Sequence, residues 1–146
     1  MSHWAPGVQI KWPNDLVVDG AKLAGILLER EGDAVVAGFG VNLAEAPRFL
    51  ERPATSIAAL TGKSPDPDAF LEILVADFAR VLEQWRREGI APIRRRWLES
   101  AHPIGTALAT SDGAGLFDGL EESGALRLRL DDGKVRVVHA GDVFLI

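Results

Sequence analysis

The segments KWPNDL at Lys11–Leu16 and KLAGILLE at Lys22–Glu29 place two lysines among apolar residues that are typical of β-strands. Lysine is seldom buried without a partner, because removing its ammonium group from water is costly unless an anion or hydrogen bonds compensate. In a strand over residues 22–30, one face would carry Lys22, Ala24, Ile26 and Leu28. The pattern therefore predicts an anionic ligand for Lys22, and the alternative is a lysine that reaches solvent at the sheet edge.

Residues 34–42 are predicted to form the next strand, and glycines make one of its faces partly bare. Gly38, Gly40 and Asn42 share that face, because side chains alternate along a strand. Glycine weakens a strand, so two glycines at alternate positions indicate that a ligand or another main chain approaches closely. Close packing between strands is the competing explanation.

These segments resemble, in this order, the second half of the catalytic domain of biotin protein ligase, the enzyme that attaches biotin to a carrier lysine. The matching blocks are KWPND at Lys11–Asp15, KLAGILLE at Lys22–Glu29 and GFGVNL at Gly38–Leu43, where the family has G-x-G-[IV]-N-[LM]. The family's G-R-G-R-x-G-R loop, normally upstream of KWPND, does not occur in this sequence. We therefore expect a truncated ligase with little or no turnover by itself.

The resemblance implies a two-step reaction in which biotin and ATP give biotinyl-5'-AMP and the biotin then passes to a lysine of the biotin carboxyl carrier protein. It assigns Lys22 as the cation that touches both the biotin carboxylate and the phosphate. It further implies that Lys11 contacts phosphates and that Asn42 hydrogen-bonds adenine. The remaining implied binding residues are Asn14, Asp15, Gly25, Gly38 and Gly40. Asp15 could orient a hydrated Mg²⁺, although Pro-Asn-Asp is also a common turn.

The predicted fold class is α+β. The resemblance implies a mixed sheet with packed helices, of the class II aminoacyl-tRNA synthetase and biotin ligase type, incomplete at its N-terminus, over residues 1–100. It implies a small SH3-like barrel over 101–146, in line with five short strand patterns at 106–110, 115–120, 125–130, 135–139 and 143–146.

Three helices are expected before the barrel. A short one is capped by Thr55-Ser56, after an irregular stretch over 44–54, and stops at Gly62. A long one over 67–88 starts at Asp66 and ends at Gly89. Its apolar stripe, expected to pack on the sheet, comprises Phe70, Leu74, Phe78, Leu82 and Trp85. A third helix over 92–100 carries three arginines, which are expected on a solvated face, and buries Trp97.

Composition limits the function further. The formal net charge of −5, without a basic run near the motifs or a helix-turn-helix, predicts no nucleic-acid partner. The chain has no cysteine, its three histidines lack metal-site spacing, and no stretch is apolar enough for a membrane helix. These features predict a cytoplasmic protein that binds no membrane. An incomplete sheet would leave a free edge, which predicts a homodimer or aggregation.

Three functional hypotheses follow from these observations. The first is a biotin-[acetyl-CoA-carboxylase] ligase, active only with the remainder of the site. The second is a non-catalytic remnant or binding module that contacts a carrier through its SH3-like end. The third is a ligase for a related acyl group such as lipoate, and KWPND followed by KLAGILLE favours biotin over lipoate.

Overall fold

The computed structural model describes residues 4–47 and 52–146, and its contacts divide the chain into two compact units. The first unit comprises the described parts of Met1–Ile10 and Asn14–Leu71, and the second comprises Lys11–Pro13 and Glu72–Ile146. Of the irregular stretch predicted over 44–54, residues 48–51 lie outside the described residues. The α+β fold class is confirmed.

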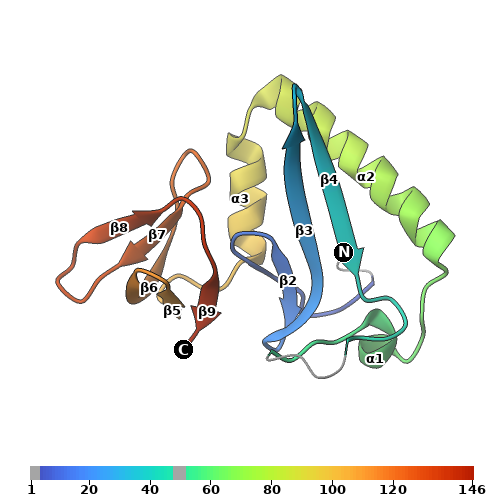
Figure 1. Ribbon diagram of the computed structural model, residues 1–146, viewed down its shortest axis with the longest axis horizontal. Coiled ribbons are helices and arrows are strands. Elements are labelled where there is room, and N and C mark those ends of the chain that lie inside the picture. Colours follow the sequence, from blue (N-terminus) through green and yellow to red (C-terminus); the bar gives the residue numbers. More distant parts are fainter. Residues whose placement is uncertain (1–3, 48–51) are drawn as a thin grey trace. The chain divides into compact units, whose positions relative to one another are not determined.

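Four strands form the sheet of the N-terminal half, in the order β1-β2-β3-β4. They are β1 (Gln9–Lys11), β2 (Asp15–Val18), β3 (Ala21–Glu31) and β4 (Ala34–Val41). Asp19 and Gly20 join β2 to β3 with φ values of 49° and 77°, which suit a tight hairpin turn. Strands β3 and β4 continue as a long hairpin well beyond the end of β2 (Figure 1).

A β-bulge interrupts the pairing of β2 with β3. Leu16 lies opposite Ala24, but the next residue, Val17, lies opposite Lys22. Three residues of β3 therefore face two residues of β2, and such a bulge reverses the alternation of side chains at its position. The bulge changes the face to which Lys22 belongs, which the sequence pattern alone did not predict.

The helix predicted after the irregular stretch is confirmed as α1 (Ile57–Thr61). The Ser56 hydroxyl accepts a hydrogen bond from the Ala59 amide, and Gly62 ends the helix with a φ of 77°. The segment before α1 is joined to β3, because the Lys22 amide donates to the Pro53 carbonyl at 2.9 Å.

Helix α2 (Pro67–Glu88) begins and ends where the sequence predicts. The Asp66 carboxylate accepts a hydrogen bond from the Ala69 amide, and Gly89 follows the last residue with a φ of 75°. The burial predicted for its apolar stripe is only partly right. Phe70 is buried, but the Trp85 side chain is 52% exposed and Phe78 is also exposed. Amphipathic spacing therefore did not determine how much of this helix face is covered.

The second unit contains α3 (Ala91–Ser100) and a five-stranded antiparallel sheet in the order β8-β7-β6-β5-β9. The strands are β5 (Ala107–Thr110), β6 (Gly113–Leu120), β7 (Leu126–Arg129), β8 (Val135–Val138) and β9 (Val143–Leu145). The buried cluster consists of Trp12, Leu108, Phe117, Leu120, Leu126, Leu128, Val138 and Val143. Trp97 and Leu98 of α3 pack against it, while the indole of Trp12 donates to the Gly124 carbonyl at 3.1 Å.

The arginines of α3 differ in their surroundings. Arg95 and Arg96 are exposed, as predicted for a solvated face. Arg94 is half-buried, and its guanidinium donates to the Leu120 carbonyl at 3.2 Å. Arg94 therefore links α3 to β6 within the second unit.

Candidate functional site

The ammonium group of Lys22 lies 2.5 Å from the Asp15 carboxylate. The Asp15 side chain is almost buried, at 12% exposure, whereas the Lys22 side chain is 49% exposed. Lys22 is therefore half-exposed, in line with the alternative of a lysine that reaches solvent, and it has a carboxylate partner within the chain.

The face occupied by Lys22 differs from the prediction. Regular alternation of side chains along the strand would place Lys22 on the same face as Ala24 and Ile26. A methyl group added at Gly25 would lie 3.0 Å from the Lys22 Nζ atom and 3.2 Å from the Asp15 Oδ1 atom, so both charged groups lie over Gly25. The bulge at Leu16/Val17 accounts for the change, since it breaks the alternation between Lys22 and the rest of β3.

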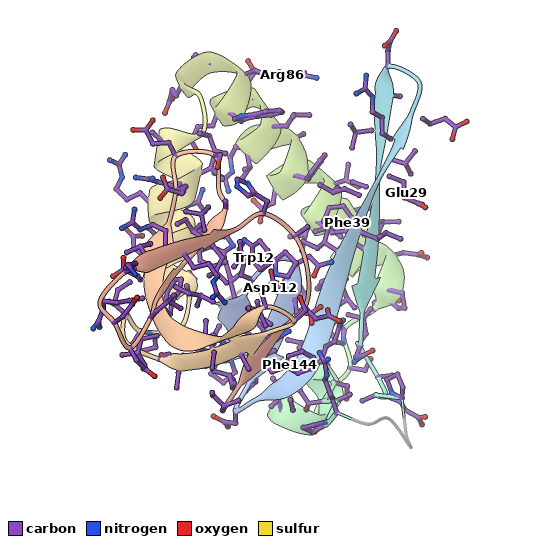
Figure 2. All side chains as sticks on the ribbon, turned by 60° about the vertical axis from the view of Figure 1, so that its left-hand side comes forward. Trp12, Glu29, Phe39, Arg86, Asp112 and Phe144 are labelled. Carbon is purple, nitrogen blue, oxygen red and sulfur yellow. The ribbon has the colours of Figure 1, made fainter. Side chains whose placement is uncertain are left out.

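Three glycines form a bare strip of backbone beside this ion pair. Gly25 pairs with Gly40, and Leu27 pairs with Gly38, across the β3–β4 hairpin. Directly opposed residues of an antiparallel pair share a face, so Gly25, Gly38 and Gly40 lie together. The labelled Phe39 belongs to this hairpin, as does Glu29 further along it (Figure 2).

Space is tight at only one of these positions. At Gly25 an added methyl group would lie 3.0 Å from the end of the Lys22 side chain, which would have to shift by a few tenths of an ångström. At Gly38 the nearest atom would be the Leu27 carbonyl oxygen at 3.7 Å, and at Gly40 the Gly25 carbonyl oxygen at 3.9 Å. Those distances are ordinary contacts, and neither residue has a positive φ. Within the described residues, packing between strands does not explain Gly38 and Gly40.

Two open grooves adjoin the strip, with volumes of about 420 and 510 Å³. The first is lined by Asn14, Lys22, Gly25, Gly38, Phe39 and Gly40. The second is lined by Lys22, Gly25, Gly40, Asn42, Pro47 and Ala54. The ammonium of Lys22 is thus the cationic group common to both grooves.

The side-chain amides of Asn14 and Asn42 hold backbone segments in place. The Asn14 amide donates to the Ile26 carbonyl at 2.6 Å, which joins the start of β2 to β3. The Asn42 amide donates to the Thr55 carbonyl at 2.9 Å. The roles that the family resemblance implies for these residues in ligand binding stay predictions.

Lys11 belongs to the second unit, and it affects His102 there. His102 is buried, and its Nε2 atom has no hydrogen-bond partner among the described residues. Burial lowers the pKa of His102, and the positive charge of Lys11 lowers this pKa further. The sequence assigned no role to His102, because the burial of a single histidine before a proline cannot be predicted from its neighbours in the sequence.

No group of three or more potential metal-ligating side chains occurs among residues 4–47 and 52–146. Over the same residues, no helix combines the length and the apolar character that a membrane crossing requires.

Two family descriptions match the chain. The Biotin/lipoate A/B protein ligase family matches residues 6–43, and the Biotin protein ligase C terminal domain matches residues 114–146. Over 96% of its length the chain is similar to the biotin-[acetyl-CoA-carboxylase] ligase of Paracoccus denitrificans, at 43% identity. The chain belongs to the biotin protein ligase family.

Other ligases show the same similarity. The biotin-[acetyl-CoA-carboxylase] ligase of Mycobacterium tuberculosis is 34% identical over 92% of the chain. The match spans 64% of the Paracoccus denitrificans ligase and 52% of the Mycobacterium tuberculosis ligase. The fold resembles that of a biotin protein ligase from Aquifex aeolicus solved in complex with biotin and ATP, with a TM-score of 0.84 and 22% identity. That comparison covers 95% of this chain and 62% of the other, and it concerns the fold alone.

Proposed function

We propose that this chain supplies the Lys22 part of the active site of a biotin-[acetyl-CoA-carboxylase] ligase. The observation that carries the proposal is the bare strip at Gly38 and Gly40 beside the Lys22 ammonium. Because packing within the chain does not require these glycines, the space above them is available to a ligand. An anionic ligand would meet the ammonium of Lys22 at the edge of that space.

The first step joins biotin to the adenylyl group of ATP. An oxygen of the biotin carboxylate attacks the α-phosphorus, the bond from that phosphorus to the bridging oxygen breaks, and pyrophosphate leaves with the electron pair. Two anionic groups approach each other in this step, so a fixed cation between them stabilises the transition state. Lys22 supplies that cation. Mutations that remove one such electrostatic group lower rates on the order of 10²–10³-fold in well-studied enzymes.

The second step transfers biotin to an amine. A lysine amine of the biotin carboxyl carrier protein attacks the acyl carbon of biotinyl-5'-AMP, AMP leaves with the electron pair, and the amine loses a proton. In this proposal Lys11 contacts nucleotide phosphates, with Asn14 directed at the same region, and Asn42 hydrogen-bonds adenine. Gly25 allows close approach of biotin, and Gly38 and Gly40 line the nucleotide side. The family description matched at 6–43 includes all of these residues and supports the assignments.

The role of Asp15 toward Mg²⁺ fits the structure less well. Mg²⁺ binds through one or two carboxylates together with substrate phosphates and keeps several waters. Here the Asp15 carboxylate is held by the Lys22 ammonium at 2.5 Å, and the described residues contain no acidic cluster around it. We therefore assign no step to the metal through Asp15.

The proposal extends to the organisation and partners of the protein. Residues 1–100 belong to the catalytic domain, and residues 101–146 form an SH3-like domain that contributes to carrier recognition. The C-terminal domain match at 114–146 supports this division. The net charge of −5 argues against nucleic acid as the main partner, and we propose that the protein works in the cytoplasm.

Among the alternatives, a lipoate-type ligase has the weaker support. One matching family description covers both biotin and lipoate ligases, but the Paracoccus denitrificans and Mycobacterium tuberculosis relatives are both biotin ligases. The non-catalytic alternative predicts that the chain never supports adenylation, even when the remainder of a ligase is supplied.

The test is biotin-dependent exchange of pyrophosphate into ATP, measured for the chain alone and with the N-terminal segment of the Paracoccus denitrificans ligase added in trans. We expect little or no exchange from the chain alone, because the G-R-G-R-x-G-R loop is absent from this sequence. We expect exchange on complementation, which Lys22→Ala abolishes and the exposed-residue control Lys63→Ala does not. Absence of both exchange and biotin binding in the complemented sample would refute the proposal.

A further inference from the structure

The position of the Lys22 side chain depends on two other residues of the hairpin. A lysine side chain that is half exposed ordinarily samples many rotamers, so holding it in one place requires a specific restraint. The Asp15 carboxylate, 2.5 Å from Nζ, supplies an electrostatic restraint. Gly25 supplies a steric condition, because a methyl group there would lie 3.0 Å from Nζ and 3.1 Å from Cε of Lys22 and would push the end of the side chain from its present position.

We propose that Asp15 and Gly25 are positioning residues that hold the Lys22 ammonium across the face of the sheet in readiness for an anionic ligand. This inference rests on the proposed function, since it concerns the same lysine. It gives Asp15 a role toward Lys22 in place of the role toward Mg²⁺ that the resemblance implies.

The backbone around Asp15 fixes the carboxylate before any ligand binds. Asp15 is opposite Gly25 in the strand register, and the neighbouring Asn14 is bonded to Ile26 through both its side-chain amide and its carbonyl. The start of β2 is therefore held against β3, and the Asp15 side chain is almost buried there. Because the Asp15 carboxylate has little freedom to move, it fixes the position of the Lys22 ammonium group.

The Lys22 ammonium can bind a ligand while it is paired with Asp15. An ammonium group has three N–H donors, so a bond to one carboxylate leaves donors for oxygens of a second anion. The exposed half of the Lys22 side chain is the side from which such an anion arrives. The proposal therefore predicts that Asp15 improves the placement of Lys22 without blocking it.

The direct test measures the order of the Lys22 side chain by carbon NMR relaxation at Cε in the 146-residue chain. We expect an ordered Cε in the unaltered protein and a mobile one, comparable to that of Lys63, in Asp15→Asn and in Gly25→Ala. The control Asp19→Asn changes an exposed carboxylate in the turn of the same hairpin and should leave Lys22 ordered. If Lys22 remains ordered in Asp15→Asn, the proposal is wrong, and this variant decides the matter even if Gly25→Ala does not fold.

A second measurement connects the positioning to binding. Biotin affinity is measured by calorimetry, with the N-terminal segment of the Paracoccus denitrificans ligase added in trans, for the unaltered chain, Asp15→Asn, Lys22→Ala and the double variant. Asp15→Glu serves as the conservative replacement. We expect each single change to weaken binding at least fivefold, the double variant to bind no more weakly than Lys22→Ala, and Asp15→Glu to recover part of the loss. Additive losses would show that Asp15 acts independently of Lys22 and would overturn the proposal.

The two measurements separate the two proposals. If the complemented sample binds no biotin but the order of Lys22 depends on Asp15, the positioning stands as a property of the fold and the proposed function fails. If biotin binds and Lys22→Ala abolishes binding while Asp15→Asn does not alter it, the proposed function stands and the positioning role fails.

Discussion

Replacing Gly40 by alanine should stabilise the fold while weakening ligand binding. A methyl group at this position would have the Gly25 carbonyl oxygen as its nearest neighbour at 3.9 Å, which is an ordinary contact, and Gly40 has no positive φ. Replacing glycine by alanine at a compatible backbone position stabilises proteins by about 0.4–1 kcal/mol, because the unfolded chain loses conformational freedom. We expect a gain of that size for Gly40→Ala.

The same substitution at Gly25 should stabilise the fold less than Gly40→Ala does. There the added methyl group would lie 3.0 Å from Nζ and 3.1 Å from Cε of Lys22, so the end of the lysine must shift by a few tenths of an ångström. That shift weakens the ion pair with Asp15. Exposed ion pairs contribute about 0–1 kcal/mol, and Lys22 is half exposed, so the electrostatic loss is small. We expect this loss to offset part or all of the gain of about 0.4–1 kcal/mol from the stiffer unfolded chain.

The assay is urea unfolding of the unaltered chain, Gly40→Ala and Gly25→Ala, followed by tryptophan fluorescence and by circular dichroism. Biotin and ATP binding are then measured for the unaltered chain and for Gly40→Ala, each with the N-terminal segment of the Paracoccus denitrificans ligase added in trans. A loss of more than about 1 kcal/mol in Gly40→Ala would show that packing requires this glycine, and the argument for a ligand above the strip would fail. Unchanged binding of both ligands by a stabilised Gly40→Ala variant would also refute it.

Three further predictions concern other parts of the chain. Burial lowers the pKa of His102 in the folded protein. Neutral His102 therefore contributes its full stabilisation above the ordinary histidine pKa of about 6.5, and this stabilisation is lost as the pH falls through the lower pKa of the folded state. His102→Asn should make the urea midpoint fall less steeply between pH 7.5 and 5, and an equally steep fall would contradict this. Trp12→Phe removes the hydrogen bond to the Gly124 carbonyl and should lower the free energy of unfolding, measured in urea, by about 0.5–1.5 kcal/mol. An unchanged free energy of unfolding would show that this hydrogen bond is absent in solution. In the long β3–β4 hairpin Leu28 is 65% exposed and Val36 is 54% exposed, so we expect the chain to self-associate. Val36→Lys should reduce this self-association, measured by light scattering. A monodisperse monomer of the unaltered chain at high concentration would contradict the prediction.

Much of the local structure follows from the sequence because the responsible signals are local. Ser56 and Asp66 cap helices through their own side chains, and Gly62 and Gly89 end helices by adopting a positive φ. The Asp19-Gly20 turn between β2 and β3 depends in the same way on two residues that adopt positive φ values. Such features depend on a few neighbouring residues, so they can be recognised without knowledge of the rest of the fold.

The environment of the candidate site could not be predicted in this way. The sequence identified Lys22 and the glycines as candidate site residues, together with the family to which they belong. It did not predict that the Lys22 ammonium lies over Gly25 against Asp15, since a bulge exists only when two strands pair. Nor did it predict the burial of His102 or the exposure of Trp85.

The sequence by itself therefore determined the family, the α+β class, the helix ends and turns, and the candidate residues, because chemistry and backbone preference are properties of single residues and short segments. Tertiary structure decided the partner of Lys22, the space beside each glycine of the strip and the burial of each side chain. Those properties depend on the register of paired strands and on contacts between residues far apart in the chain.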